Sequence, residues 1–129
     1  MKTILLALIL VMVQPVFGQS ASNTQCNLAV GEEVFALCSA CHTRSTAEPA
    51  REGPSLFSVI GRKAGSVSGY KFSPALSGSG WTWDENTLNQ FLKNPRQALP
   101  GTTMTFIGLK SETERRAVAC YMGTFKNIG

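Results

Sequence analysis

The 129-residue sequence has few charged residues and no cluster of them: it contains 12 Lys and Arg and 8 Asp and Glu, with at most two basic residues in a row. Such scattered positive charge does not indicate a nucleic-acid-binding surface, although a formal net charge of +4 suits docking on an acidic protein surface. Alternating apolar and polar residues, which mark half-buried strands, are also scarce. Internal repeats are absent.

Long apolar runs are limited to Ile4–Val13, whose ten residues are too few for a membrane-spanning helix of about 20. Lys2 precedes the run, and Gly18 supplies a small residue for cleavage after it. We therefore expect residues 1–18 to be a signal peptide rather than a membrane anchor. Residues 19–129 would then form one small domain, exported to a bacterial periplasm without stable membrane insertion.

Helical periodicity dominates the remaining sequence and predicts an all-α fold. We expect helices at about 27–40, at a short segment from Ser73, at 82–95 after the capping pattern "TWDE", and at 111–125 after "SETE". The segment 43–72 is rich in Gly, Pro and Ser and is expected to be an ordered loop. Loops this long in so small a domain need a packing partner, which indicates a bound apolar group in the core.

The motif "CSACH" joins Cys38, Cys41 and His42, the only histidine of the chain. A thioredoxin-like dithiol would need a strand and a βαβ context, which this sequence lacks. A tetrahedral zinc site would need Cys26 or Cys120 as its fourth ligand, and adjacent Cys and His ligands would strain it. The third interpretation, which the spacing favours, is covalent attachment of a c-type haem through both thiols, with the imidazole binding the iron.

A second axial ligand cannot be another histidine of this chain. Outside the predicted signal peptide the methionines are Met104 and Met122. Met122 has helical spacing with neighbouring apolar residues, which is typical of packing. Met104 lies in the loop sequence "LPGTTMTF", where a thioether suits an iron ligand, although simple packing would also account for it.

Residues 27–125 resemble class I cytochromes c, the monohaem type of the bacterial periplasm and of mitochondria. The resemblance lies in four blocks in the family's order: "GEEVFALCSACH", "GPSLFSVIGRKAG", "GYKFSPALSGSGWTWDENTLNQFLKNP" and "PGTTMTFIGLKSETERRAVACYM". It implies crossing N- and C-terminal helices, with short helices and long loops around one covalent haem c. It also implies that Met104 is the second iron ligand beside His42.

The same resemblance implies roles for the residues around the haem. The carbonyl of Pro54 would accept a hydrogen bond from His42 and orient its ring. Thr102 matches a hydroxyl near one haem propionate. Three further positions match residues that approach the other propionate: Arg62, Tyr70 and Trp83.

The resemblance further implies that the first helix packs on the last, with Gly31 and Phe35 facing Tyr121. This crossing would bring Cys26 and Cys120 within reach of each other. In an oxidising compartment we expect them to form a disulfide, the alternative being two unpaired core thiols.

The implied function is that of an electron carrier, because His and Met on both sides of the iron leave no free site for a substrate. Two alternatives remain: a peroxidase-like or sensing haem protein with an open iron face, and a haem subunit of a periplasmic dehydrogenase. The implied partners are redox proteins with acidic docking surfaces. They are a quinol-oxidising complex or dehydrogenase as donor and a terminal oxidase or photosynthetic centre as acceptor, with the chain itself monomeric.

Some positions depart from the commonest pattern of the family. Phe72, Leu76 and Phe91 stand where many members carry Tyr, Asn and Tyr, so we expect a drier pocket behind Met104. Few basic residues are also expected around the haem edge, since Thr103 and Ala98 replace a common Lys and Tyr. The remaining candidates for such residues are Arg51, Arg96 and Lys110.

Overall fold

The computed structural model describes residues 26–126, which fold into helices joined by long ordered loops. The helices are α1 (Leu28–Ser39), α2 (Pro74–Ser77), α3 (Glu85–Lys93), α4 (Pro95–Ala98) and α5 (Glu112–Met122). No strand forms within this range, where an isolated antiparallel bridge joins Lys63 and Thr82. The predicted all-α class is confirmed, and none of the helices described has the length and apolar character needed to cross a membrane. The predicted signal peptide lies outside the described residues.

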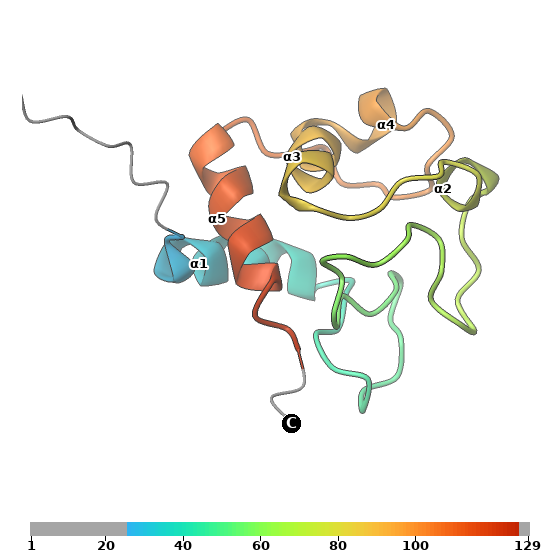
Figure 1. Cartoon of the computed structure of the whole chain (residues 1–129), viewed down its shortest axis with the longest axis horizontal. Helices are drawn as coiled ribbons and strands as arrows, with labels where there is room; N and C mark the ends of the chain where they lie inside the picture. The colour runs from blue at the N-terminus through green and yellow to red at the C-terminus, as the bar shows by residue number, and fades with distance from the viewer. Residues whose placement is uncertain (1–25, 127–129) are drawn as a thin grey trace, which may run out of the picture.

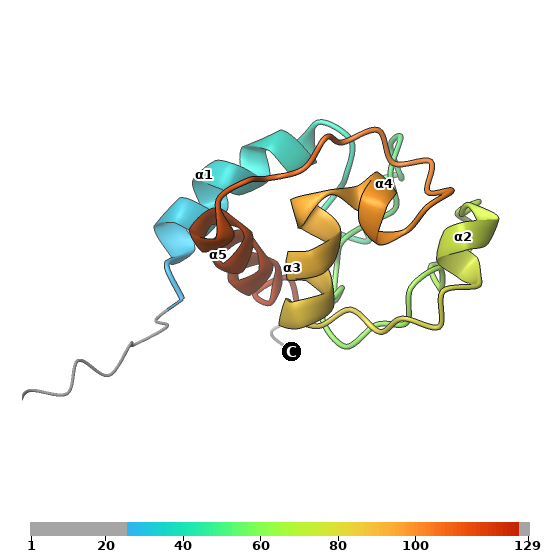
Figure 2. The same cartoon turned by 90° about the horizontal axis from the view of Figure 1, so that it is seen from above.

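Helices α1 and α5 cross at one end of the molecule (Figures 1 and 2). Gly31 permits the close approach, because a Cβ at this position would lie 2.7 Å from the Cβ of Tyr121 and would also clash with the Ala117 carbonyl. Beside this contact the Phe35 ring packs on Tyr121 and Phe125, with centroid distances of 5.7 and 4.9 Å. The crossing forms one end of the hydrophobic core.

Helix α3 begins later than the "TWDE" pattern predicts. Asp84, not Thr82, is the N-cap: its carboxylate accepts the Thr87 amide at 2.7 Å, and the Thr87 hydroxyl accepts the Asp84 amide at 2.8 Å. The residues before Asp84 are held in extended conformation, since the Trp83 amide donates to the Arg62 carbonyl at 2.9 Å. The observed N-cap therefore lies two residues after the predicted one, because hydrogen bonds to a distant part of the chain hold the residues before Asp84.

The short helix α4 was not predicted. Asn94 ends α3 and also caps α4, because its side chain accepts the Gln97 amide at 3.1 Å. Pro95, which was expected only to end the preceding helix, occupies the first turn of the new one, where a missing amide hydrogen costs nothing.

Helix α5 starts at the predicted position, with the Ser111 hydroxyl accepting the Glu114 amide at 3.3 Å. It ends at Met122 rather than near 125, and Gly123 is its C-cap. Phe125 lies beyond the helix, where its carbonyl accepts the Ser58 amide at 2.6 Å. The chain thus leaves the helix to bind the loop 43–72.

That loop lies below α3 and α4 in Figure 1, where it is coloured teal to green. It consists of turns and bends, as expected from its composition. The orange segment between α4 and α5 returns past α3 to the start of α5 (Figure 2). These two irregular segments, together with α1 and α3, enclose the cavity described next.

Candidate functional site

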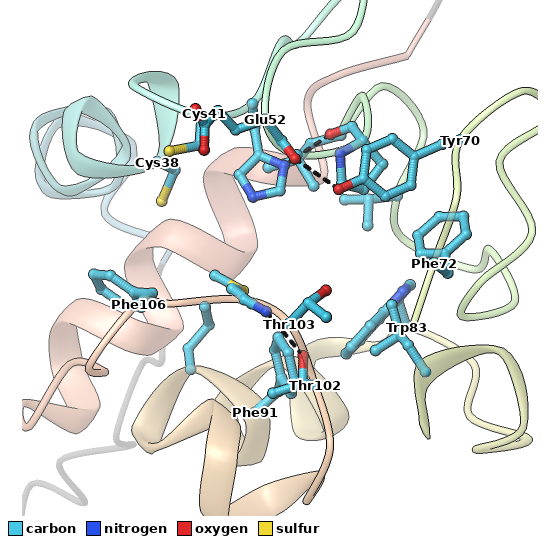
Figure 3. Close-up of a pocket in the computed structure, with 18 of the residues that line it drawn as sticks. Cys38, Cys41, Glu52, Tyr70, Phe72, Trp83, Phe91, Thr102, Thr103 and Phe106 are labelled. Carbon is cyan, nitrogen blue, oxygen red and sulfur yellow. Dashed lines mark hydrogen bonds between the residues drawn. The ribbon is translucent and has the colours of Figure 1, made fainter. Parts of the chain in front are cut away.

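A cavity of about 390 Å³ occupies the middle of the molecule, within the range of about 300–1,000 Å³ typical of ligand pockets. Most of its wall is apolar, with side chains from α3 and from the loops on either side. All nine residues predicted to hold the cofactor line this one cavity: Cys38, Cys41, His42, Pro54, Arg62, Tyr70, Trp83, Thr102 and Met104. Figure 3 shows the cavity with part of its lining.

The two free thiols lie at one edge of the cavity, where α1 ends (Figure 3). The Cys41 and His42 amides both donate to the Cys38 carbonyl, at 3.1 and 2.9 Å, and this tight turn directs all three side chains to the cavity. Burial, with a smaller effect from the neighbouring Cys41, raises the pKa of the Cys38 thiol to about 11. Cys38 is therefore a neutral thiol in the protein alone.

The His42 ring is held in one orientation. Its Nδ1 lies 2.7 Å from the Pro54 carbonyl, which only accepts, so Nδ1 carries the hydrogen and Nε2 keeps a free lone pair. Burial lowers the pKa of His42; the Pro54 bond opposes this effect and the Arg62 charge adds to it. The neutral imidazole with an available Nε2 is the form that binds a metal ion.

Gly53 lies directly against this ring, and sequence analysis did not single it out. A Cβ at Gly53 would stand 2.6 Å from His42 Nδ1 and 2.8 Å from Nε2. The Gly53 amide also donates to the Cys41 carbonyl at 2.8 Å, which ties the loop to the "CSACH" turn. The position of Gly53 directly before Pro54 was the available sequence signal for its role. Its contact with His42 forms only when folding brings the loop to the "CSACH" turn.

The opposite wall comes from the segment between α4 and α5. Thr102 and Thr103 lie across the cavity from Cys38, Cys41 and Tyr70 in Figure 3. Met104 follows them, and its amide donates to the Thr102 hydroxyl at 3.3 Å. Met122, from α5, also lines the cavity while remaining 3% exposed in the core. Both thioethers therefore line the cavity, and each is a candidate iron ligand by position.

A polar end of the cavity is formed by Arg62, Tyr70 and Trp83. Arg62 donates to the Phe57 carbonyl at 2.6 Å and to the Ser55 carbonyl at 2.8 Å, and burial lowers the pKa of its guanidinium. Among residues 26–126 it has no carboxylate partner, so its charge is available to an anionic group.

The other two residues of this end differ in their free donors. The Tyr70 hydroxyl donates to the Glu52 carbonyl at 2.6 Å, so donation to a ligand would require that bond to be exchanged. The Trp83 indole nitrogen, which points into the cavity in Figure 3, has no hydrogen-bond partner in the described part of the chain.

The remaining two cysteines are joined elsewhere. Cys26 and Cys120 form a disulfide with a Cα–Cα distance of 5.8 Å, which links the start of α1 to α5. Neither is available as the fourth ligand of a zinc site at Cys38, and no group of three His, Cys, Asp or Glu side chains suited to a metal ion occurs in the described range. The lining fits a flat apolar group with an acidic edge, attached through two thiols and met by nitrogen and sulfur ligands.

The basic side chains expected around the cavity mouth are only partly free. Arg51 donates to the Ser39 carbonyl at 2.6 Å, at the end of α1, and pairs with Glu48 at 3.5 Å. Arg96 and Lys110 are exposed and make no ion pair in the described range. The mouth also carries the apolar side chain of Leu37, which is 60% exposed.

Comparison with known proteins gives consistent relatives. The chain is 45% identical over 95 residues to cytochrome c2 of Rhodomicrobium vannielii, covering 73% of this chain and 75% of that protein. It is 47% identical over 92 residues to cytochrome c2 iso-2 of Magnetospirillum molischianum, covering 71% and 94%. The structure of cytochrome cH from Methylobacterium extorquens superposes with a TM-score of 0.69 at 42% identity, covering 74% of this chain and 95% of that one. No protein-family model matches the sequence.

Proposed function

The chain belongs to the class I cytochromes c, a family of electron carriers with one covalently attached haem c, and we propose that it carries single electrons through a haem bound in the central cavity. In this proposal Cys38 and Cys41 attach the haem, and His42 and Met104 bind its iron. The observation that carries the proposal is the convergence of two thiols, an oriented imidazole and a thioether on one apolar cavity.

Haem c supplies an iron that alternates between its ferrous and ferric states, and the residues around it decide how it is held. Addition of the Cys38 and Cys41 thiols across two vinyl groups would form C–S bonds and would keep the cofactor from dissociating. The Pro54 carbonyl keeps Nε2 of His42 aimed into the cavity and raises the basicity of the ring. The thioether of Met104 is a soft ligand that favours the ferrous state and raises the potential.

The polar end of the cavity would receive the haem carboxylates. Arg62 is already oriented by two backbone carbonyls and lacks an acidic partner in the described range, and Trp83 has a free indole hydrogen. Fixed donors of this kind offset the cost of taking a carboxylate out of water. Thr102 would serve the second carboxylate from the opposite wall, since it lines the same cavity.

We also propose that the carrier works in a bacterial periplasm after removal of residues 1–18. Its partners would be redox proteins with acidic docking surfaces: a quinol-oxidising complex or dehydrogenase as donor, and a terminal oxidase or photosynthetic centre as acceptor. The exposed Cys41 and Leu37 support docking at the cavity mouth, and we expect the carrier to act as a monomer. Such contacts between carriers are small and short-lived.

The decisive experiment compares the two thioethers that line the cavity. Met104→Leu should lose the ferric methionine–iron charge-transfer band and bind CO in the ferrous state. Met122→Leu, a matched change on the same cavity, should keep the band and exclude CO. Rapid CO binding by the unaltered protein would instead indicate an open iron face, and with it the alternative of a haem enzyme or sensor. Release of pigment from the matured protein by acid–acetone would contradict covalent attachment.

A further inference from the structure

Arg115 is a buried cation whose role is not explained by the cofactor site. Its side chain lies in α5 and is 5% exposed. It makes no ion pair within the described residues, unlike its neighbour Arg116, which pairs with Glu112 at 2.8 Å. Because a buried charge is costly unless hydrogen bonds compensate it, its partners indicate what it stabilises.

Three hydrogen bonds, each of 2.7 Å, compensate the Arg115 charge. Nε donates to the side-chain oxygen of Asn89 in α3, while Nη1 donates to the carbonyls of Leu109 and Lys110. Arg115 therefore joins α5 and α3 to the end of the segment that carries Met104. Hydrogen bonds of a charged donor are stronger than those of a neutral one.

The rest of this segment is held near its two ends. The Leu109 amide donates to the Leu92 carbonyl at 2.7 Å, and Gly108, at a φ of 104°, packs against the backbone of Lys93. At the other end the Thr102 amide donates to the Leu99 carbonyl at 3.1 Å. Between these ends, the Met104 amide bond to the Thr102 side chain is local. The position of Met104 thus depends on how firmly the ends are held.

We propose that Arg115 is a positioning residue that holds the Met104 segment closed over the cavity. Its guanidinium fastens the segment where it enters α5, which keeps the thioether at the iron and slows its exchange for external ligands. The proposal rests on the proposed function in one respect, that Met104 is the iron ligand. Its other part, local stabilisation of the segment, can be measured without that assumption.

The test uses ferric holoprotein and cyanide, which binds iron only after the methionine has left. Arg115→Met keeps the volume and removes all three hydrogen bonds. We expect it to bind cyanide about tenfold faster or more, the effect of losing at least one hydrogen bond to a charged group. Arg116→Met, on the adjacent residue, should bind cyanide at the rate of the parent. Equal rates for the two variants would overturn the proposal.

Native-state hydrogen exchange separates local opening from general destabilisation. In Arg115→Met the Leu109 amide should lose more protection than the amide of Val118, which lies fully buried in α5. Equal losses at the two amides would overturn the proposal, because Arg115 would then stabilise only the whole fold. This exchange test remains valid even if the unaltered protein lacks the methionine–iron band. That outcome would reject Met104 as the iron ligand, but it would not reject the local stabilisation of the segment by Arg115.

Arg115→Lys provides a second variant in case Arg115→Met does not accumulate with haem. A lysine keeps the charge but cannot span Asn89 and both carbonyls at once. We expect a cyanide rate between those of the parent and Arg115→Met, or above that of the parent where only Arg115→Lys folds. Where only Arg115→Lys folds, a rate equal to that of the parent would overturn the proposal, because the multiple contacts of the guanidinium would not be needed to hold the segment.

Discussion

Phe91 shows how single residues shape the environment of the candidate site. It is 6% exposed and packs on Trp83 with a centroid distance of 5.2 Å, so that aromatic surface forms this wall of the cavity. Phe72 and Leu76 add further apolar surface. No side-chain hydroxyl in the described range donates to the Met104 sulfur. This lining supports the expectation of a dry pocket behind Met104.

Phe91→Tyr should therefore lower the midpoint potential, because a hydroxyl near the haem favours the more highly charged ferric state. If the ferric state gains the free energy of one hydrogen bond, the midpoint potential falls by about 20–60 mV. Redox titration monitored in the haem bands measures the shift. Phe125→Tyr is the matched control, since Phe125 is equally buried but does not line the cavity. A potential unchanged in Phe91→Tyr would contradict the dry-pocket hypothesis.

At the scale of elements, capping determines where the helices begin. Asp84 holds α3 by accepting the amide and the hydroxyl of Thr87, at 2.7 and 3.0 Å. These bonds, the amide first, keep the pKa of the Asp84 carboxyl below its ordinary value. Helix α3 in turn supplies Leu88, Phe91 and Leu92 to the core and the cavity. The cap therefore supports one wall of the site.

The lowered pKa of Asp84 predicts an acid-dependent loss of stability. The contribution of its charge is complete above the ordinary Asp pKa and is lost as the pH falls through the lower pKa of the folded state. Asp84→Asn keeps a capping oxygen without this charge. The difference in unfolding free energy between the parent and Asp84→Asn should thus shrink between about pH 5 and pH 2.

Denaturant unfolding followed by circular dichroism measures this difference at each pH. Ser111→Asn, which exchanges one neutral cap for another on α5, is the control and should differ from the parent by a constant amount. A constant difference for Asp84→Asn as well would show that its charge does not stabilise α3.

At the scale of the whole molecule, the Cys26–Cys120 disulfide joins two segments separated by 94 residues. It links the start of α1 to the helix on which α1 packs, so it reinforces the crossing at Gly31. A cross-link that closes so long a loop restricts the unfolded chain far more than the folded one. The cross-link therefore also stabilises the long loops between α1 and α5, because these loops have little regular structure of their own.

Replacing both Cys26 and Cys120 with Ser should lower the free energy of unfolding by about 2–5 kcal/mol. Guanidinium chloride unfolding of the ferrous holoprotein measures the loss. Adding a disulfide-reducing agent to the parent should bring it to the stability of the double variant, while the variant itself should not respond. Thiol labelling of these two cysteines in denatured, unreduced protein would contradict the disulfide.

The features that depend on neighbouring residues were accessible from the chain alone. The motif at 38–42 contains the complete attachment chemistry within five residues, and caps such as Ser73 and Ser111 lie within three residues of the amides they accept. The all-α class and most helix positions follow from the same local rules. Family resemblance added Pro54, Arg62, Tyr70, Trp83 and Thr102 to the residues of the motif and to Met104, and all nine line the observed cavity.

Features that join distant segments depended on the folded chain. The cap of α3 moved to Asp84 because the residues before it bond to Arg62, and Gly53 contacts His42 because a loop returns to the "CSACH" turn. The hydrogen bond from the buried Arg115 to Asn89 in α3 likewise has no local signal. Hydrogen bonds and packing between residues far apart in the chain form only when folding brings those residues together, so sequence spacing alone does not specify them.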